Sequence, residues 1–370
     1  MSKMQWTKEK AWEWYNAHPW IRGCNFIGSD CANRRDQWQS YGREERMKTA
    51  DREMALAEKI GFNSVRLIVD FDVWLQERES YMSVLEEYIS IAASHGLSVM
   101  YVLAHEAQLP RGIYEEFVPK ALGEQIYAKG YHQGRFPLTP EEIAKKPYHY
   151  LEREDLREKY LEMVTETVTR YANDERILCW NVYNEPGIII GKRSIPLLDL
   201  LFSTVRACDP IQPLTADIWR RAENGKARFE EEQHAFELSD VVSFHYYGSY
   251  IETVLQIEEM RKLERPLMCT EWLNRIMYND VKDIYPLFYL ENIACYCWGF
   301  VVGKTQTHEP WESLWNDYYN PDKNVDYDFT KWQHDLFRIN YRPYDPKEIE
   351  IIEKFNKIAD SHKKYTIKKR

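Results

Sequence analysis

Two kinds of apolar pattern alternate along the chain. Short runs rich in β-branched and aromatic residues have the composition of buried strands, and longer stretches between them carry a helical repeat. The clearest helical stripe lies within residues 155–171 and comprises Leu156, Tyr160, Val164, Thr167 and Tyr171. Because strands and helices alternate almost throughout, the pattern predicts an α/β fold with a parallel sheet.

The pattern contains eight strand-like segments. They lie at residues 21–27, 64–69, 97–104, 177–183, 213–216, 241–246, 267–270 and 293–302. Helices are predicted between them at 44–60, 81–95, 155–171, 197–208, 229–238, 251–263 and 281–290, and after them near 331–337 and 346–358. Eight such units close into a (β/α)8 TIM barrel. We therefore predict a single domain over residues 1–370, with an N-terminal extension at about 1–20 and C-terminal helices at about 331–370.

A long irregular insertion follows the third predicted strand. Residues 106–150 contain Gly123, Gly130 and Gly134 together with several prolines. A connection of this length is unusual inside a compact domain and is typical of a functional loop. We expect it to close over one side of a site, although a surface loop remains an alternative.

Two of the predicted strands end at a glutamate. The fourth strand runs into Asn184-Glu185-Pro186, and the seventh stops at Glu271. A carboxylate at the end of a buried strand is costly to desolvate, and barrel enzymes carry their chemistry at the carboxyl ends of the strands. The sequence therefore predicts that Glu185 and Glu271 form a pair of catalytic acids facing one substrate.

Polar or aromatic side chains lie at nearly all of the strand ends. In chain order they are Asn25, Arg66, His105, Asn184, Asp217 or Trp219, His245, Tyr247 and Trp298. Since all these ends meet at one rim of a barrel, we expect the side chains to surround the two glutamates.

Composition excludes several classes of partner. Lys and Arg total 49 against 59 Asp and Glu, a formal net charge of −10, and the basic runs lie only in the last few residues. Nucleic acid and anionic membranes are therefore not expected as partners. Arg34, Arg35 and Arg135 could nevertheless form a local basic patch. Aromatic residues make up 14% of the chain, and flat rings of this kind suit stacking on sugars.

Cofactor and compartment signals are weak. The seven cysteines show no zinc-ligand spacing and lie mostly in strand-like runs, so we expect buried thiols in a reducing compartment. No apolar run reaches membrane-spanning length, and residues 1–14 lack the apolar stretch of a signal peptide. The sequence thus predicts a cytoplasmic protein without metal or other cofactor, and it does not predict an oligomeric state.

The strand-end motifs resemble those of a known family. Asn184-Glu185-Pro186 and Glu271 are similar to the catalytic motifs of retaining glycoside hydrolases of the (β/α)8 clan A, which includes family 5 cellulases and mannanases. Arg66, His245-Tyr246-Tyr247 and Trp298 extend the resemblance over about 21–337. The stretch 22–27 with Trp38-Gln39 also resembles bacterial proteins of this clan that are called cellulase- or xylanase-like.

The resemblance implies a role for each side chain. Glu185 would be the acid/base that protonates the leaving oxygen, and Glu271 the nucleophile that attacks the anomeric carbon. We expect Asn184 to bond to the sugar 2-hydroxyl, and we expect Arg66 and Tyr247 to bond to Glu271. His245 would orient Glu185, and Trp298 would form a floor beneath the sugar. Substrate contacts are expected for Asn25, His105, Gln306, His308 and Trp311.

The function predicted from these residues is a retaining β-glycoside hydrolase of carbohydrate metabolism. The absence of a separate carbohydrate-binding module and of a secretion signal favours oligosaccharides or small glycosides over an insoluble polymer. A loop at 106–150 that blocks one end of a groove would mean exo-action. Two alternatives remain: a non-catalytic or weakly active carbohydrate-binding barrel, and a metal-dependent barrel hydrolase.

Overall fold

The structure is a computed structural model that describes residues 5–107, 109–112 and 117–361. Its eight strands are parallel and follow the order β5-β4-β3-β2-β1-β8-β7-β6. They are β1 (Arg22–Asn25), β2 (Ser64–Ile68), β3 (Ser98–Val102), β4 (Ile177–Tyr183), β5 (Leu214–Ala216), β6 (Val242–His245), β7 (Leu267–Trp272) and β8 (Ala294–Cys297). The two end strands meet through a parallel bridge between Ile218 and Phe244. The sheet is therefore a nearly closed barrel, which confirms the predicted TIM-barrel fold.

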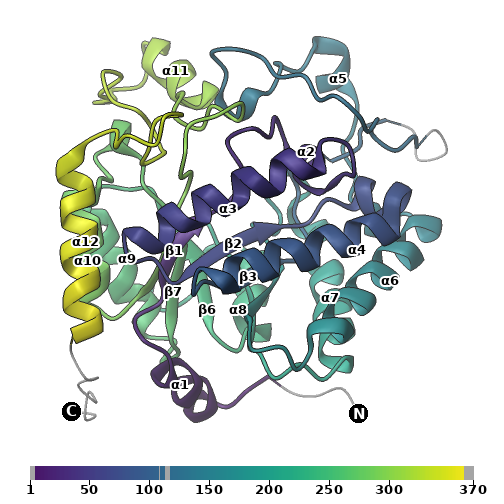
Figure 1. The fold of residues 1–370 in the computed structure, drawn as a ribbon, viewed down its shortest axis with the longest axis horizontal. Helices are drawn as coiled ribbons and strands as arrows, with labels where there is room; N and C mark the ends of the chain where they lie inside the picture. The colour runs from purple at the N-terminus through teal and green to yellow at the C-terminus, as the bar shows by residue number, and fades with distance from the viewer. Residues whose placement is uncertain (1–4, 108, 113–116, 362–370) are drawn as a thin grey trace.

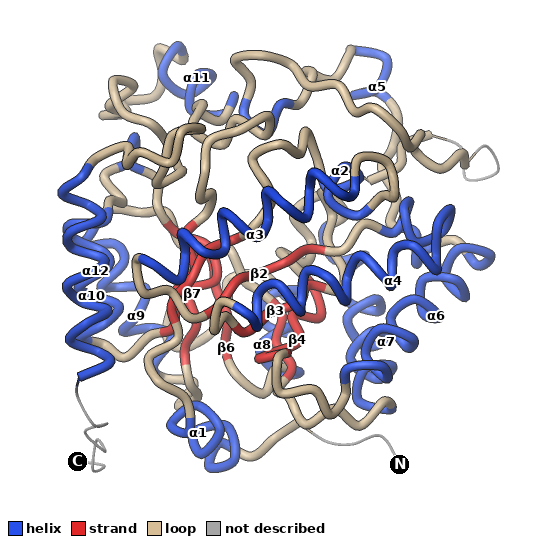
Figure 2. Tube along the Cα trace, viewed as in Figure 1, coloured by secondary structure: helices blue, strands red, loops and turns tan. Residues whose placement is uncertain are grey.

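Helices surround the strands, as Figure 2 shows. The helices that follow the eight strands are α3 (Arg43–Lys59), α4 (Phe71–Ser94), α6 (Glu154–Tyr171), α7 (Ile195–Ala207), α8 (Glu230–Leu238), α9 (Tyr250–Arg261), α10 (Val281–Leu290) and α12 (Pro346–Ser361). Every residue of β4 is buried, because a strand of a helix-covered barrel has no face open to water. Apolar side chains of α6 such as Leu156 and Val164 face this core.

The two ends of the barrel differ. Short α1 (Lys8–Ala17) lies at the end where the described chain begins, and its Ala11 and Tyr15 pack with Met100 and Met268 inside the barrel. At the opposite end, drawn at the top of Figure 1, lie α5 (Pro140–Ala144), α11 (Glu312–Tyr319) and long loops. One end is thus filled with apolar side chains, and the other carries the loops that surround the ends of the strands.

The segment between β3 and α6 contains little regular structure. It includes a short 3-10 turn at His132–Gly134, the five-residue α5 and another 3-10 turn at Tyr150–Glu152. Residues 108 and 113–116 of this predicted insertion lie outside the described residues.

The predicted helix near 331–337 is wrong. This segment has no helical structure, and its backbone instead bonds to the loop that follows β8, with Leu336 N and Phe337 N both donating to Phe300 O. Asp335 adopts a φ of 61°, which interrupts a helical path. In the predicted C-terminal region of about 331–370, the one helix in the described residues is α12, and residues 362–370 lie outside them. Within the described residues no helix has both the length and the apolar character needed to cross a membrane.

Candidate active site

The chain turns sharply at Glu185, two residues after β4. Glu185 adopts a φ of 50°, a left-handed conformation that a non-glycine residue adopts only when its surroundings hold it. Buried Glu106 supplies that restraint: its carboxylate accepts from Gly187 N at 2.6 Å, Ile189 N at 2.6 Å and Ile190 N at 2.9 Å. The loop after Glu185 is therefore fixed by backbone N–H groups that point at one carboxylate.

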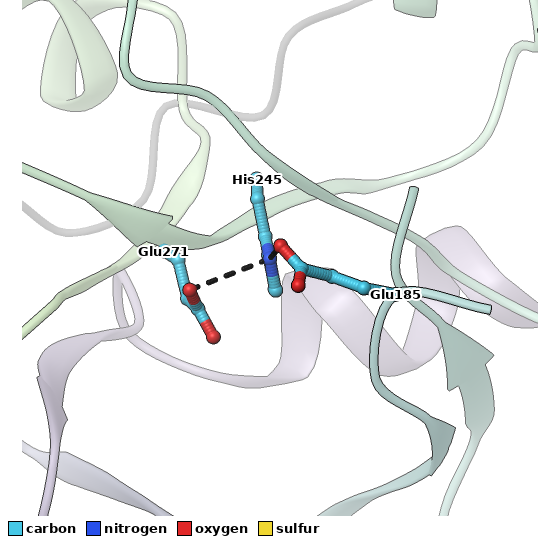
Figure 3. A group of neighbouring side chains, drawn as sticks. All are labelled: Glu185, His245 and Glu271. Atoms are coloured by element: carbon cyan, nitrogen blue, oxygen red, sulfur yellow. Dashed lines mark hydrogen bonds and ion pairs between the residues drawn. The ribbon is translucent and has the colours of Figure 1, made fainter. Parts of the chain in front are cut away.

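A histidine lies between the two predicted catalytic glutamates (Figure 3). His245 Nδ1 is 2.7 Å from Glu185 Oε1 and 3.4 Å from Glu271 Oε2. One oxygen of each carboxylate and a ring nitrogen of His245 all lie within 4.8 Å of one another. The structure thus brings strands β4, β6 and β7 together at one cluster, as the positions of their ends predicted.

Glu271 receives two further donors. Arg66 Nη1 donates to Glu271 Oε1 at 2.9 Å, and the Tyr247 hydroxyl donates to Oε2 at 2.8 Å. Burial raises the pKa of the Glu271 carboxyl above its usual value, whereas His245, Arg66 and Tyr247 oppose that rise. Both oxygens of the buried Glu271 carboxylate therefore accept a hydrogen bond, Oε1 a charge-assisted bond from a guanidinium and Oε2 a bond from a phenol.

Arg66 lies at the centre of a wider buried network. Its Nη2 donates to Asn184 Oδ1 at 2.6 Å and to Asp217 Oδ2 at 2.8 Å, and its Nη1 also donates to Asn25 Oδ1 at 2.6 Å. Arg66 and Asp217 are both fully buried. Although burial raises the pKa of Asp217, Arg66 and His245 outweigh burial and hold that pKa well below its usual range. Asp217 is thus the permanent negative charge beneath the site.

His245 carries a positive charge at neutral pH. Burial acts to lower its pKa, but the carboxylates of Glu271, Asp217 and Glu185 overcome burial and raise the pKa to about 10. Its Nε2 lies 3.5 Å from Asp217 Oδ2, on the side opposite Glu185. The imidazolium therefore connects Asp217 to Glu185 and holds the Glu185 carboxyl in place.

The side-chain amide of Asn184 has a bonded oxygen and a nitrogen that is free to donate. Its Oδ1 accepts from Arg66, which settles the orientation of the amide, and its Nδ2 donates to no group in the described part of the chain. Asn25 differs, because its Nδ2 donates to the carbonyls of Thr270 and Cys297. Asn184 can therefore donate to a ligand, whereas Asn25 ties β1 to its neighbours.

A cavity adjoins the carboxylate cluster. Its wall includes Asn25 and Arg66 from the cluster, Trp298 after β8, Arg34 at the start of helix α2 (Arg34–Trp38), and Gln133 and Arg135 from the insertion. Trp298 thus lines the cavity, and its role as a floor for the substrate stays a prediction. The wall residue Gln133 comes from the insertion after β3, so this insertion contributes directly to the site.

These observations accompany a match to a known family. The family model described as Cellulase (glycosyl hydrolase family 5) matches residues 22–284, well over half of the chain. The chain belongs to glycosyl hydrolase family 5. This family 5 member is thus a glycoside hydrolase of the (β/α)8 clan A, as the strand-end motifs predicted. No curated protein matches the chain in sequence.

Solved structures of similar fold include several glycoside hydrolases. The Streptomyces cattleya GH5_18 protein in complex with GlcNAc has a TM-score of 0.59 and 11% identity, covering 93% of this chain and 81% of that one. A family 5 mannosidase from Rhizomucor miehei has a TM-score of 0.55 and 13% identity, covering 92% and 94%. The exo-β-1,4-mannosidase Op5Man5 from Opitutaceae bacterium strain TAV5 has a TM-score of 0.56 and 14% identity, covering 91% and 59%. At these identities the likeness concerns the fold.

Three residues of this family 5 member that were predicted to contact substrate are engaged elsewhere. Gln306 accepts from Gly130 N at 2.8 Å and donates to Ala128 O at 2.6 Å, so its amide ties the insertion to the loop after β8. His308 lies 3.4 Å from Glu309 and packs on Trp332. His105 Nε2 lies 3.2 Å from Val69 O. Burial lowers the pKa of His105 well below its usual value, so its ring is neutral.

Trp311 lies behind Tyr247. Its indole meets the Tyr247 ring edge-on at 5.0 Å between centroids, and its Nε1 donates to His132 Nε2 at 3.1 Å. His334 contacts both rings, at 5.5 Å from Tyr247 and 5.4 Å from Trp311. Trp311, predicted as a subsite residue, therefore positions the tyrosine that bonds to Glu271.

Sequence reasoning missed several important side chains. Asp217 was considered only as one of two strand-five candidates, yet it bonds to Arg66. Glu106 entered only as the first residue of the insertion at 106–150, and Arg34 and Arg135 only as members of a basic patch. For Asp217 a signal existed, because a carboxylate at a strand end resembles Glu271. For the arginines no local pattern shows that they meet at one cavity.

Proposed function

We propose that this family 5 member is a retaining β-glycoside hydrolase that acts on oligosaccharides or small glycosides by double displacement. The observation that carries the proposal is the close approach of Glu185 and Glu271, with carboxylate oxygens within 4.8 Å. Retaining enzymes hold their carboxyl groups about 5–5.5 Å apart, whereas inverting enzymes separate them by about 6.5–9.5 Å to admit a water. The short separation favours direct attack by a carboxylate on the sugar.

The surroundings of the two carboxyl groups suit different roles. Glu271 accepts from Arg66 and Tyr247 and so keeps its charge, as a nucleophile must. The Glu185 side chain is 19% exposed, and in the described part of the chain its carboxylate bonds only to His245, which leaves an oxygen free for a leaving group. Glu185 would donate its proton to the glycosidic oxygen as the bond from Glu271 to the anomeric carbon forms. It would then take a proton from the water that releases the sugar.

Asn184 and Trp298 would complete the substrate site. The free Nδ2 of Asn184 is available to the sugar 2-hydroxyl, a bond that strengthens as positive charge develops at the anomeric carbon. Trp298 would offer its ring as the apolar face beneath the sugar. Both roles rest on family resemblance, together with the bond between Asn184 and Arg66 and the place of Trp298 in the cavity wall.

The insertion favours a pocket over an open groove. Gln306 bonds to the backbone at residues 128 and 130, and His132 Nδ1 lies 2.8 Å from Glu309 O, so this part of the insertion is tied to the loop after β8. Gln133, between these ties, lines the cavity beside Trp298. A wall at this point supports release of single sugar units from one end of a substrate. Two fold neighbours, a mannosidase and an exo-β-1,4-mannosidase, are consistent with such exo-action.

The stereochemical course of the reaction tests the mechanism. In a variant that lacks one of the two carboxylates, azide can enter the vacated space and attack the anomeric carbon. We expect Glu271→Gly with azide to yield the α-glycosyl azide, because azide attacks from the side of the missing nucleophile. We expect Glu185→Ala with azide to yield the β-glycosyl azide, because the glycosyl-enzyme on Glu271 still forms. Proton NMR of the products distinguishes the two anomers, and a wild-type product of inverted configuration would overturn the proposal.

Neither rival function suits the site as well. The Glu185, His245 and Glu271 cluster has the donor atoms of a metal site, but Arg66 already bonds to Glu271 and His245 holds a proton up to a pKa of about 10. A metal ion would have to displace that proton beside a guanidinium, which favours an acid–base site over a metal site. A non-catalytic barrel would need neither two carboxylates at retaining distance nor a separate partner set for each.

A further inference from the structure

Two arginines in the wall of the cavity have no partner of their own. Arg34 begins α2 (Arg34–Trp38), and Arg135 follows the 3-10 turn of the insertion. Within the described part of the chain, neither guanidinium makes a hydrogen bond or lies within 4 Å of a carboxylate, and the buried Nε of Arg135 lacks any acceptor. Both side chains are only partly exposed; each also lines a second pocket, Arg34 one beside Asp70 and Arg135 the groove along the insertion.

Other buried arginines in the described part of the chain each have several acceptors, although the Nε of Arg66 has none. Arg275 bonds to both oxygens of Glu348 and to two backbone carbonyls, and Arg206 bonds to Asp240 and to a carbonyl. Arg66 has four acceptors. The lack of partners at Arg34 and Arg135 is therefore particular to the cavity rather than general to the protein.

Two cations near one another without a directly bonded carboxylate are unfavourable in a sheltered cavity, although the more distant carboxylates of Asp70, Glu271 and Glu185 favour the charge of Arg34. Burial lowers the pKa of Arg34 to about 10, and burial together with the charge of Arg34 lowers the pKa of Arg135 to about 9. Both guanidinium groups nevertheless remain charged at neutral pH. An anion between them would restore the missing hydrogen bonds and offset the repulsion.

The position of Arg135 is built into the fold. The residues before it are held by bonds from Gln306 to the backbone at residues 128 and 130, and Ala128 N donates to Gly134 O at 2.8 Å. Gly134 has a φ of 59°, and a side chain there would meet Lys304 O at 2.7 Å, so only glycine allows this close approach. Arg135 thus reaches the cavity directly after a segment that these bonds hold in place.

The cavity adjoins the network that holds the nucleophile. Its wall includes Arg66, which bonds to Glu271, and Asn25, which bonds to Arg66, whereas neither glutamate itself lines the cavity. We propose that the sugar unit attacked by Glu271 carries an anionic group, a carboxylate, phosphate or sulfate, which Arg34 and Arg135 bind. This inference rests on the proposed function and narrows it to anionic glycosides. Arginine suits such groups because its planar N–H fork matches two oxygens at once.

Kinetics on matched substrates test the proposal. Aryl β-glycosides in the gluco, galacto and manno configurations are compared as sets, each set with a neutral 6-hydroxymethyl group, a 6-carboxylate, a 6-phosphate or a 6-sulfate. We expect one anionic class to exceed its neutral counterpart by about tenfold or more in kcat/KM. Arg135→Gln should raise KM for that class by about tenfold while kcat changes little, and should raise KM for the neutral substrate much less. The preferred class identifies which anion the site takes.

The matched control is Arg111→Gln. Arg111 lies on the same insertion and lines the neighbouring groove, but not this cavity. Arg111→Gln should leave KM unchanged for both the anionic and the neutral substrate. An equal effect of Arg111→Gln and Arg135→Gln would mean general attraction by positive charge and would overturn the proposal. So would a preference for the neutral member in every set. Arg135→Lys and melting temperatures separate loss of binding from loss of folding.

A binding measurement separates this proposal from the catalytic one. Calorimetry on wild type and Arg135→Gln is carried out with free glucuronate, glucose 6-phosphate, glucose 6-sulfate and glucose. Binding of one anion by wild type, lost in Arg135→Gln, supports the anion site even if no aryl glycoside is hydrolysed, in which case the proposed function fails alone. Hydrolysis of neutral glycosides without anion binding or anion preference overturns the anion site and leaves the proposed function standing.

Discussion

The Tyr247 hydroxyl donates a hydrogen bond of 2.8 Å to Glu271 Oε2. Tyr247 comes from the loop after β6, and Glu271 belongs to β7, so the bond joins two neighbouring strand ends. Rings of Trp311 and His334 pack on Tyr247 and hold its phenol in this direction. The hydrogen bond is therefore a fixed feature of the site and one of the effects that hold down the pKa of Glu271.

Tyr247→Phe should weaken catalysis and move its pH profile. Loss of one donor to a charged group should lower kcat/KM by about 10- to 100-fold. Because the donor holds down the pKa of Glu271, its removal should raise that pKa, and the acid limb of the profile should shift to higher pH. The measurement is kcat/KM against pH for both enzymes. An acid limb that stays in place would contradict the assignment of Glu271 as the ionised carboxylate.

Arg66→Met should destabilise the fold strongly. The change deprives the buried carboxylates of Asp217 and Glu271 of the guanidinium that bonds to both and leaves them only His245 as a cation; breaking a buried pair in this way costs about 3–5 kcal/mol. Urea unfolding measures the loss. The control is Arg78→Met, whose partners Glu162 and Glu166 lie at the surface; its cost should stay within about 1 kcal/mol. Equal losses for the two variants would show that the buried network contributes nothing special.

The charge on His245 should make stability depend on pH. Its folded-state pKa of about 10 lies above the ordinary value of 6.5. Its contribution is therefore complete below about pH 6.5 and is lost as pH rises to about 10. We expect the difference in unfolding free energy between wild type and His245→Gln to shrink across this range. A difference that grows with pH would mean that His245 is neutral in the folded protein.

Gln306→Ala should loosen the insertion rather than remove a sugar contact. The variant leaves the N–H of Gly130 and the carbonyl of Ala128 without their partner, at a cost of about 1–3 kcal/mol. Hydrogen exchange should speed up at residues 127–135. Gln233→Ala, at an exposed amide that bonds to Ala227 N and Glu237, serves as the control and should leave exchange at 127–135 unchanged. Unaltered exchange at 127–135 in Gln306→Ala would show that this amide does not hold the insertion.

Regular elements were predicted well where the apolar pattern is strong. The bounds of β4 and α10 agree with the predicted 177–183 and 281–290. The start of α4 was missed, because Asp70 caps a helical turn at Val73 that precedes a kink at Glu77. Periodicity weakens across such a kink, so only the later part of α4 was visible in the pattern. At 331–337, contacts with the loop after β8 override the local preference.

The sequence by itself determined the barrel and the place of the two glutamates. Apolar periodicity is local, and the carboxyl ends of parallel strands must meet at one rim, so Glu185 and Glu271 could be paired without coordinates. Only the tertiary structure decided that His245 lies between them, that Gln306 ties the insertion, and that Arg34 and Arg135 share a cavity without partners. Those relationships join loops far apart in the chain, and loop paths depend on long-range packing that no local pattern encodes.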